Sequence, residues 1–439
     1  MLRGIIMNIS IFGLGYVGVV TAACLAQYGH KVIGVDIAKE KVDLINAGKS
    51  PIVEEKIEEI VSQAVASNRL YATESTREAI SKSDVAFVCV GTPSCDDGSL
   101  DTSYVELVTQ NIGQTLRMRR KFFLVVFRST VTPGTVRSIV IPLLEENSGK
   151  ELGSGIEVVF HPEFLREGSS VQDFYEPPKI VIGERIQGTG KPVMDLYEGI
   201  EAPRHFCSLE VAEMIKYADN IFHAVKITFS NEIGILCQRY GIDSRKVMEI
   251  FFTDTKLNIS PAYLRPGFAF GGSCLPKDLR AILSLARDGN VKMPMLEHIM
   301  YSNRMQIKRV LQFILNSESQ IIGFYGLTFK SGTDDLRESP LVELAERLLG
   351  KGFVLRIRDE FVQVNRLFGK NKAYIQKHLP HLAKLMVKST NEFNECDTIL
   401  LGHPANSEEV IKWLEAGICV FDLTGENRFS GAKNYYAII

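Results

Sequence analysis

The sequence predicts an α/β protein made of two doubly wound domains that a long central helix joins. Short apolar segments that suit buried strands alternate with helical segments near the N-terminus, and the same alternation returns after residue 320. Between these regions, residues 209–240 form a helical pattern that no proline interrupts and that contains one glycine, Gly234. The length of 439 residues suits two or three domains, at about 150 residues each.

Composition and charge exclude several classes of protein. Hydrophobic residues make up 45% and charged residues 23% of the chain, as in ordinary globular proteins. Fifty Lys and Arg residues face 52 Asp and Glu residues, so we expect neither nucleic acid nor a membrane as a partner. The eight cysteines are dispersed without a Cys-x-x-Cys pair. We therefore expect no metal site and no disulfide framework, and we expect the protein in the reducing cytoplasm.

The first strand is expected at residues 8–12, followed by the motif GLGYVG at residues 13–18 and a helix. The apolar run 9–26 is long enough to resemble a membrane span, but three glycines at this spacing are more typical of a tight strand-to-helix turn. In such a turn Gly13 permits the bend, Gly15 lets the backbone approach a pyrophosphate, and Gly18 lets the helix pack closely on the strand. The motif therefore predicts a Rossmann-like dinucleotide site.

A second strand, at residues 31–35, ends in Asp36, 18 positions after the last glycine of the motif. An acid at this place accepts hydrogen bonds from the ribose hydroxyls of NAD and repels the additional phosphate of NADP. The alternative is a glycine-rich turn beside a solvated aspartate. The intact strand-helix-strand frame favours NAD as the cofactor.

Three further strands end in polar motifs. The strands expected at 84–90, 122–127 and 158–160 lead into the sequences GTP at 91–93, RST at 128–130 and HPEFLRE at 161–167. Ligands of open parallel sheets bind outside the carboxyl ends of the strands, so we expect the site among these motifs.

The second α/β region begins with a strand at 320–325. A helix from Leu341 and strands at 353–357, 398–401 and 418–423 follow. Gly323 and Gly326 follow the dinucleotide pattern only in part, because no third glycine matches. We therefore expect this region to bind a smaller nucleotide ligand rather than a dinucleotide.

One cysteine lies in a segment with the composition of a reactive site. Cys274 is part of FAFGGSCLPKD, residues 268–278, where glycines bring the backbone close to a ligand and Lys277 and Asp278 place charge beside the thiol. A free structural cysteine is the alternative. Together with a nicotinamide cofactor, a thiolate suits aldehyde oxidation through a thiohemiacetal and a thioester.

Lys216 and Asn220 lie four residues apart on the long helix and therefore share a face. They could stabilise an oxyanion together, or decorate a solvated helix face, which is the commoner case for these residue types. Glu163 is ambiguous by itself, and His161 is expected to be a structural histidine rather than a base.

Taken together, these segments resemble the nucleotide-sugar dehydrogenases, the UDP-glucose and GDP-mannose 6-dehydrogenase family, over essentially the whole chain. The matching motifs are the glycine turn 13–18, GTP 91–93, RST 128–130, PGT 133–135, PEFL 162–165, EMIKY 213–217, residues 271–278, FK 329–330 and residues 335–339. The resemblance is strongest to the members that oxidise GDP-mannose, through residues 49–54, 256–258, 264–270 and 334–342.

The resemblance implies a four-electron oxidation of the C6 alcohol of GDP-mannose to GDP-mannuronate, with two NAD, in an alginate-type polysaccharide pathway. Cys274 would be the nucleophile, Lys216 and Asn220 would hold the oxyanion, and Glu163 would assist thioester hydrolysis. Thr130 and Asp278 would position water and charge. The alternative within the family is a UDP-glucose 6-dehydrogenase that makes UDP-glucuronate.

The resemblance also implies two sets of binding residues. Those expected at NAD are Gly13, Gly15, Tyr16, Val17, Gly18, Asp36, Lys41, Thr92, Thr130, Lys277 and Arg337. Those expected at the nucleotide sugar are Glu167, Lys216, Asn220, His223, Asn231, Tyr263, Arg265, Gly267 and Lys330. An aromatic residue is expected before Tyr263 but Ala262 stands there, and residues 51–59 lack the family's usual Pro-Gly.

The expected division of the chain has three parts. Residues 1–206 form a Rossmann-like NAD-binding domain, and residues 301–439 form a Rossmann-like domain that binds the nucleotide sugar. Residues 207–300 form a helical linker that carries the cysteine loop and a dimer interface, so we expect a homodimer or a larger homo-oligomer. Two other classes of protein remain, a catalytically inactive dinucleotide-binding regulator and a simple two-electron alcohol dehydrogenase, which would not need the thiol.

Overall fold

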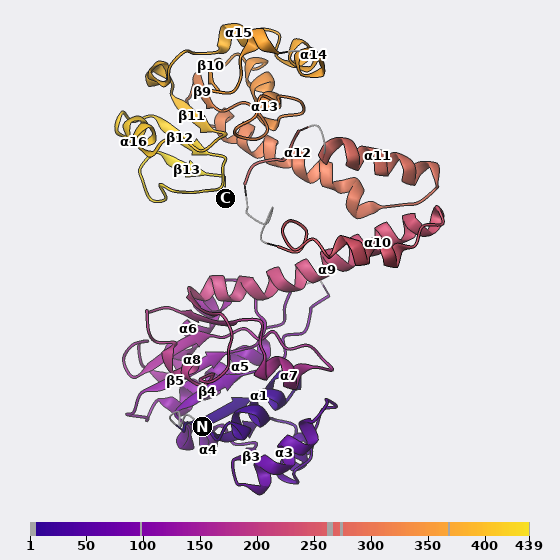
Figure 1. Cartoon of the computed structure of the whole chain (residues 1–439). Helices are drawn as coiled ribbons and strands as arrows, with labels where there is room; N and C mark the ends of the chain where they lie inside the picture. Colours follow the sequence, from indigo (N-terminus) through magenta and orange to yellow (C-terminus); the bar gives the residue numbers. More distant parts are fainter. Residues whose placement is uncertain (1–5, 97–98, 261–266, 273–274, 368, 439) are drawn as a thin grey trace. The chain divides into compact units, whose positions relative to one another are not determined.

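The computed structural model describes residues 6–96, 99–260, 267–272, 275–367 and 369–438, and Figure 1 traces the chain. Backbone packing divides it into two compact units, Met1–Ala224 and Val225–Ile439, with the boundary inside the helix α9 (Leu209–Arg239). Each unit contains a parallel β-sheet flanked by helices. The fold class predicted from the sequence is confirmed.

The first unit contains an eight-stranded sheet in the order β3-β2-β1-β4-β5-β6-β7-β8 within the described residues. Neighbouring strands run parallel except β6 and β7, which are antiparallel. The strands are β1 (Asn8–Phe12), β2 (Lys31–Val35), β3 (Leu70–Thr73), β4 (Val85–Val88), β5 (Phe123–Phe127), β6 (Ile156–Phe160), β7 (Ile180–Glu184) and β8 (Arg204–Cys207). The first six strands follow the order 3-2-1-4-5-6 of a dinucleotide-binding fold, with a crevice between the ends of β1 and β4.

Two hydrophobic cores cover the two faces of this sheet. One core packs α1, α3 and α7 against it, and the other packs α5, α6 and the start of α9. Strands such as β5, with the sequence FLVVF, are buried along their whole length because both faces are covered. The helices are α1 (Tyr16–Gln27), α2 (Lys39–Asn46), α3 (Ile57–Ala66), α4 (Thr76–Lys82), α5 (Ser103–Leu116), the π-helical turn η1 (Val136–Val140), α6 (Ile141–Ser148), α7 (Ser170–Tyr175) and α8 (Lys191–Asp195).

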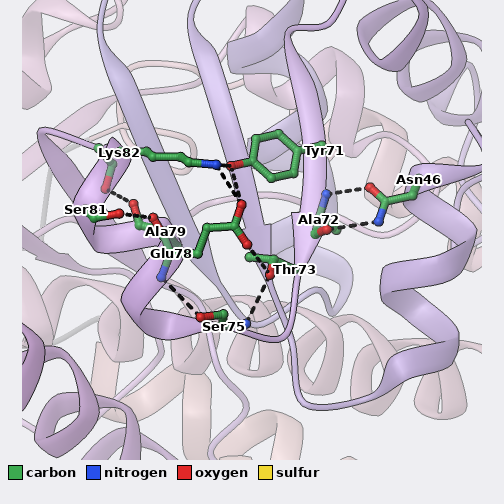
Figure 2. Close-up of polar contacts among 10 residues, drawn as sticks. Asn46, Tyr71, Ala72, Thr73, Ser75, Glu78, Ala79, Ser81 and Lys82 are labelled. Carbon is green, nitrogen blue, oxygen red and sulfur yellow. Dashed lines mark hydrogen bonds and ion pairs between the residues drawn. The ribbon is translucent and has the colours of Figure 1, made fainter.

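Side chains close the edge strand β3, as Figure 2 shows. Asn46 donates to the carbonyl of Ala72 at 2.9 Å and accepts from its amide at 2.8 Å, so an amide side chain replaces a neighbouring strand. Glu78 accepts hydrogen bonds from Tyr71, Thr73 and Lys82, and its own amide donates to Ser75, the N-cap of α4. These contacts satisfy the backbone groups of Ala72 and tie α2 and α4 to the edge strand.

The second unit contains a five-stranded parallel sheet in the order β10-β9-β11-β12-β13, again within the described residues. The strands are β9 (Ile321–Tyr325), β10 (Val354–Arg358), β11 (Thr398–Leu401), β12 (Cys419–Asp422) and β13 (Tyr435–Ala437). The helices are α10 (Ser244–Phe251), α11 (Leu275–Asp288), α12 (Pro294–Leu315), α13 (Pro340–Leu349), α14 (Gly369–His378), α15 (Leu382–Leu385) and α16 (Ser407–Glu415), with 3-10 turns η2 (Val364–Arg366) and η3 (Thr390–Glu395).

The expected strands at 8–12, 31–35 and 398–401 have these bounds in the structure, while the other expected strands differ by one or two residues at their ends. Strands β3, β7, β8 and β13 were not anticipated. The edge strand β8 has the polar, largely exposed sequence RHFC, which gives no alternation of apolar and polar residues. None of the described helices combines the length and the apolar character needed to cross a bilayer.

Candidate active site

The predicted dinucleotide turn joins β1 to α1. Gly13 has φ of +92°, a left-handed conformation that favours glycine, and its amide donates to the carbonyl of Val35 at 2.8 Å. A Cβ on Gly13 would lie 2.9 Å from the carbonyl oxygen of Cys89 at the end of β4. The turn therefore packs directly against the crevice between β1 and β4.

The other two glycines of the motif have opposite surroundings. A Cβ on Gly18 would lie 1.8 Å from the carbonyl oxygen of Gly13, so only glycine lets α1 approach β1 this closely. A Cβ on Gly15 would meet no atom within 4 Å. Gly15 precedes α1 as its N-cap residue, where free amides attract a pyrophosphate. Space at Gly15 and close packing at Gly18 are what a bound dinucleotide requires, so these residues fit NAD.

Asp36 anchors this turn at the end of β2. Its carboxylate accepts from the amide of Leu14 at 2.7 Å and from the amide of Ala38 at 2.9 Å, and Lys41 Nζ lies 3.3 Å away. These three donors leave acceptor capacity on the two oxygens for ribose hydroxyls. The same fixed negative charge disfavours a phosphate at that position, which fits NAD rather than NADP.

The loops after β4 and β5 are tied to each other beside the turn. Thr92 Oγ1 donates to the carbonyl of Thr130 at 2.6 Å, and Ser129 Oγ donates to the carbonyl of Val90 at 2.6 Å. The structure thus brings two expected NAD contacts, Thr92 and Thr130, together at the carboxyl edge of the sheet.

A buried ion pair lies at the end of β6. Lys216 Nζ on α9 is 2.7 Å from Glu163 Oε1, and each residue is only 9% exposed. The other carboxylate oxygen of Glu163 accepts from the amide of Leu165 at 2.7 Å, which fixes the side chain. Lys216 is therefore not the solvated lysine that its residue type alone would suggest. An ammonium and a carboxylate excluded from water act strongly on the charge of a reacting group.

A second buried cation lies near this pair and was not assigned from the sequence. Arg128, 4% exposed, donates to the hydroxyl of Tyr197 at 3.2 Å, while its Nε has no hydrogen-bond partner. The hydroxyl of Tyr197 lies 2.7 Å from His161 Nε2, and His161 Nδ1 lies 2.8 Å from the carbonyl of Val181. Because a carbonyl only accepts, Nδ1 carries the proton and Nε2 accepts from Tyr197. Burial, together with the charge of Arg128, lowers the pKa of His161 well below its usual value. His161 is thus a neutral structural residue, as expected.

Helix α9 is fixed to the sheet by two more acids. Glu213, fully buried, accepts from the amides of Gly134 and Val136 at 2.5 and 2.8 Å, and burial raises its pKa. Asp219 pairs with Lys179 at 2.6 Å, and the Lys179 ammonium lies 4.6 Å from the centre of the Phe164 ring. These contacts set the rotation of α9 that directs Lys216 to Glu163. Glu213 belongs to the EMIKY motif, but no role for it was predicted from the sequence.

The remaining candidates of the first unit lie around this edge. Tyr16 and Val17 begin α1 and are half-buried, and the hydroxyl of Tyr16 accepts from the amide of Gly168 at 3.1 Å. Glu54, in the atypical segment 51–59, accepts from the same amide at 2.8 Å, so this segment does more than form a surface turn. Glu167, Asn220 and His223 are exposed.

In the second unit the candidates come from four segments. Lys277 and Asp278, in the first turn of α11, pair at 3.0 Å and are both exposed. Arg337 forms a two-pronged ion pair with Asp335 at 2.7 and 2.8 Å. Two others, Asn231 and Lys330, are exposed, and Gly267 lies near the end of β12, where a Cβ would be 3.8 Å from the carbonyl oxygen of Thr424. Cys274, Tyr263 and Arg265 lie outside the described residues.

The second sheet repeats the turn of the first but leaves no place for a dinucleotide. Gly326, with φ of +93°, donates to the carbonyl of Arg358, and the amide of Leu327 donates to Asp359 at 2.8 Å, as Leu14 does to Asp36. Asp359 also accepts from the amide and hydroxyl of Thr328, and the ring of His403 covers Gly326, 2.4 Å from where a Cβ would lie. Thr328, fully buried, stands where the first turn has the open Gly15, so the space that a pyrophosphate needs is filled in the second turn.

Among the described residues, no group of His, Cys, Asp or Glu could hold a metal ion. The fold and the turn at Gly13 define a dinucleotide-binding protein, and the paired Lys216 and Glu163 lie at the carboxyl edge of its sheet. The family models agree in three consecutive parts. Residues 7–201 match the NAD binding domain of the UDP-glucose/GDP-mannose dehydrogenase family, residues 210–305 its central domain and residues 323–415 its UDP binding domain. The chain belongs to this family and is an NAD-dependent oxidoreductase.

Individual relatives cover nearly the whole chain. It is 48% identical to a GDP-mannose 6-dehydrogenase of Pseudomonas putida over 95% of this chain and 96% of that protein. The crystal structure of a ternary complex of GDP-mannose dehydrogenase from Pseudomonas aeruginosa matches with a TM-score of 0.94 and 46% identity, covering 98% of this chain and 100% of that one. A UDP-glucose 6-dehydrogenase of Haloferax volcanii is 37% identical over 79% of this chain and 81% of that protein.

Proposed function

We propose that the protein oxidises the C6 alcohol of GDP-mannose to the carboxylate, giving GDP-mannuronate for an alginate-type polysaccharide. The observation that carries the proposal is the buried Lys216–Glu163 pair at the carboxyl edge of a sheet whose glycine turn fits NAD. Identity to GDP-mannose 6-dehydrogenases is higher and extends over more of the chain than identity to the UDP-glucose enzyme, which favours GDP-mannose over the alternative substrate.

Bound NAD accepts hydride, so an alcohol needs two molecules of it to become an acid. The residues of the chain do the rest. The Lys216 ammonium stabilises negative charge on the C6 oxygen, helped by Asn220 one turn further along α9. The Cys274 thiolate adds to the aldehyde carbon and, after the second oxidation, is held as a thioester.

Hydrolysis then returns the enzyme to its starting state. A water molecule attacks the thioester carbon, one of its protons passes to a Glu163 oxygen, and the carbon–sulfur bond breaks to release the Cys274 thiolate. The acid loses its remaining proton to solvent and leaves as the carboxylate, and Glu163 also returns its proton to solvent. Other thiols suit this task poorly, because burial raises the pKa of Cys24, Cys89 and Cys396 to about 12 and keeps them protonated. Thr130 and Asp278 are assigned to the positioning of water and charge.

We further propose that residues 1–206 hold NAD, residues 301–439 hold the nucleotide sugar, and residues 207–300 supply the cysteine and a dimer interface. Exposed Ile221, Val225 and Ile227 on α9, at 57%, 45% and 63%, support that interface. The exposed candidates Glu167, His223, Asn231 and Lys330, with Gly267, Tyr263 and Arg265, are assigned to the nucleotide sugar. Lys41, Lys277 and Arg337 are assigned to NAD. A cytoplasmic location stays a prediction of the dispersed cysteines.

The test is the amount of NADH formed per nucleotide sugar consumed, at saturating NAD, with GDP-mannose and UDP-glucose supplied separately. We expect two NADH per GDP-mannose and no turnover of UDP-glucose. Cys274→Ser should stop formation of the acid, while Cys95→Ser, which changes an exposed thiol, should not. One NADH per sugar would contradict the thioester route, turnover of UDP-glucose alone would assign the other substrate, and no turnover of either would indicate a binding protein.

A further inference from the structure

We propose that Glu338 is a positioning residue that holds both flanks of the cysteine-bearing loop to the segment that carries Arg337. The inference deepens the proposed function and rests on it, because it explains how the nucleophile and an NAD-binding segment keep a fixed relation. It is drawn from described residues of the second unit, namely 267–272, 275–288, 303 and 327–342.

The N-terminal flank of the loop is pressed against the backbone of Glu338. A Cβ on Gly271 would lie 2.3 Å from the carbonyl oxygen of Glu338, and a Cβ on Gly272, where φ is +86°, would lie 2.8 Å from the Phe329 ring. From the other side, the buried Asn303 of α12 accepts from the amide of Phe270 at 2.9 Å and donates to its carbonyl at 2.8 Å. This flank is thus held between α12 and Glu338.

The C-terminal flank is held by the side chain of the same residue. Arg280 Nη1 and Nη2 on α11 lie 2.8 and 2.6 Å from the two carboxylate oxygens of Glu338. Such a two-pronged pair fixes orientation as well as distance. Glu338 therefore contacts the chain both before and after Cys274, with its carbonyl on one side and its carboxylate on the other.

The backbone of Glu338 is strained, and contacts of its two neighbours in sequence maintain that conformation. Its φ is +50°, which a glutamate rarely adopts. Ser339, 1% exposed, donates to the carbonyl of Leu327 at 2.7 Å and accepts from the amide of Leu341 at 3.2 Å, as the N-cap of α13. Arg337, on the other side, is held by Asp335. Strain that its surroundings maintain in this way is typical of positions that serve function.

The consequence concerns the thiol. Helix α11 begins at Leu275, directly after Cys274, and a helix N-terminus favours a thiolate. If Glu338 fixes α11 relative to the preceding glycines, then breaking the Arg280–Glu338 pair should slow reactions of the Cys274 thiol. Binding of the nucleotide sugar depends on other residues and should change little.

The first test needs no substrate. Purified full-length protein with Cys95→Ser as background is treated with iodoacetamide between pH 6 and 9, and alkylation of Cys274 is followed by peptide mass spectrometry. We expect Glu338→Gln and Arg280→Met to slow alkylation at pH 7 by about fivefold, since exposed charge pairs contribute about 1 kcal/mol. The matched control is Glu343→Gln, which removes a similar pair, Glu343–Arg347, within α13.

The second test separates positioning from general stability. Glu338→Gln should lower kcat about tenfold with the KM for GDP-mannose within about twofold. The charge-reversed pair Arg280→Glu with Glu338→Arg should recover at least half of the loss. The proposal would be overturned if Glu338→Gln had the same alkylation rate and kcat as Glu343→Gln. It would also be overturned if Glu338→Gln lowered the melting temperature but changed neither the alkylation rate nor kcat. A protein that oxidises neither sugar yet still shows slower alkylation would overturn the proposed function and leave the role of Glu338 intact.

Discussion

At the residue scale, the central feature is a charge pair buried where water is excluded. Lys216 and Glu163 lie on different elements, and each is the partner that makes burial of the other tolerable. The sequence placed both among the candidates, although by residue type alone a solvated helix face was the commoner case for Lys216. The distance of 2.7 Å between them decides against the solvated face.

Lys216→Met is expected to remove activity and stability together. It takes away the group that stabilises an oxyanion, a loss of about 10²–10³ in kcat, and leaves a buried carboxylate unpaired, at about 3–5 kcal/mol. Adding Glu163→Gln should restore most of the unfolding free energy but not the activity. Urea unfolding and NADH formation measure the two effects, and a double variant no more stable than Lys216→Met would contradict the pairing.

The neutral His161 predicts sensitivity to acid. The unfolded chain takes up a proton on this histidine near the ordinary pKa of about 6.5, whereas the folded protein does not until far lower pH. Its contribution to stability is therefore complete above about pH 6.5 and is lost as pH falls, by at most about 1.4 kcal/mol per pH unit. Urea unfolding at pH 7.5 and 5.5 should show a smaller acid loss for His161→Gln than for the parent. The exposed His205→Gln is the control, and an unchanged acid loss in His161→Gln would count against this assignment.

At the element scale, the turn between β1 and α1 separates a requirement of folding from a requirement of binding. Gly18 is needed because α1 contacts β1, and Gly15 because a ligand needs the space. The spacing of the glycines in the sequence predicts the same two roles.

Gly15→Ala and Gly18→Ala are expected to differ in kind. Gly15→Ala should leave the melting temperature nearly unchanged while it weakens NAD binding about tenfold or more, because its methyl group occupies open space where a pyrophosphate would approach. Gly18→Ala should destabilise the first unit by several kcal/mol through overpacking. Thermal unfolding and NAD titration by calorimetry report the two effects. Equal melting temperatures for the two variants would refute the distinction.

At the scale of the whole molecule, exposed apolar side chains along α9 predict self-association. Exposed Ile221, Val225 and Ile227 are costly to leave in water and suit the interface of a homodimer. Light scattering after size exclusion should give at least twice the chain mass, and Ile221→Glu with Ile227→Glu should give a monomer. Lys226→Glu, on the same helix, should not. A parent protein that is already monomeric would contradict the interface.

Much of the architecture was predictable because its causes are local. The alternation of strands and helices, the turn at residues 13–18 with Asp36, and the missing third glycine after Gly326 depend on neighbours in sequence, so the pattern alone indicated two doubly wound sheets and one dinucleotide site. The edge strand β8 was not predicted, because an exposed strand shows no alternation of apolar and polar residues.

Only the tertiary structure decided which groups far apart in the sequence contact each other. The pairing of Lys216 with Glu163 depends on the rotation of α9, which Glu213 and Asp219 fix, and no local propensity encodes it. Arg128 is buried without a carboxylate partner among the described residues. The carboxylate of Asp359 accepts hydrogen bonds from the turn after β9. Both look like ordinary charged residues in the sequence. Local chemistry set the elements and the cofactor, whereas burial and long-range packing set which charges meet.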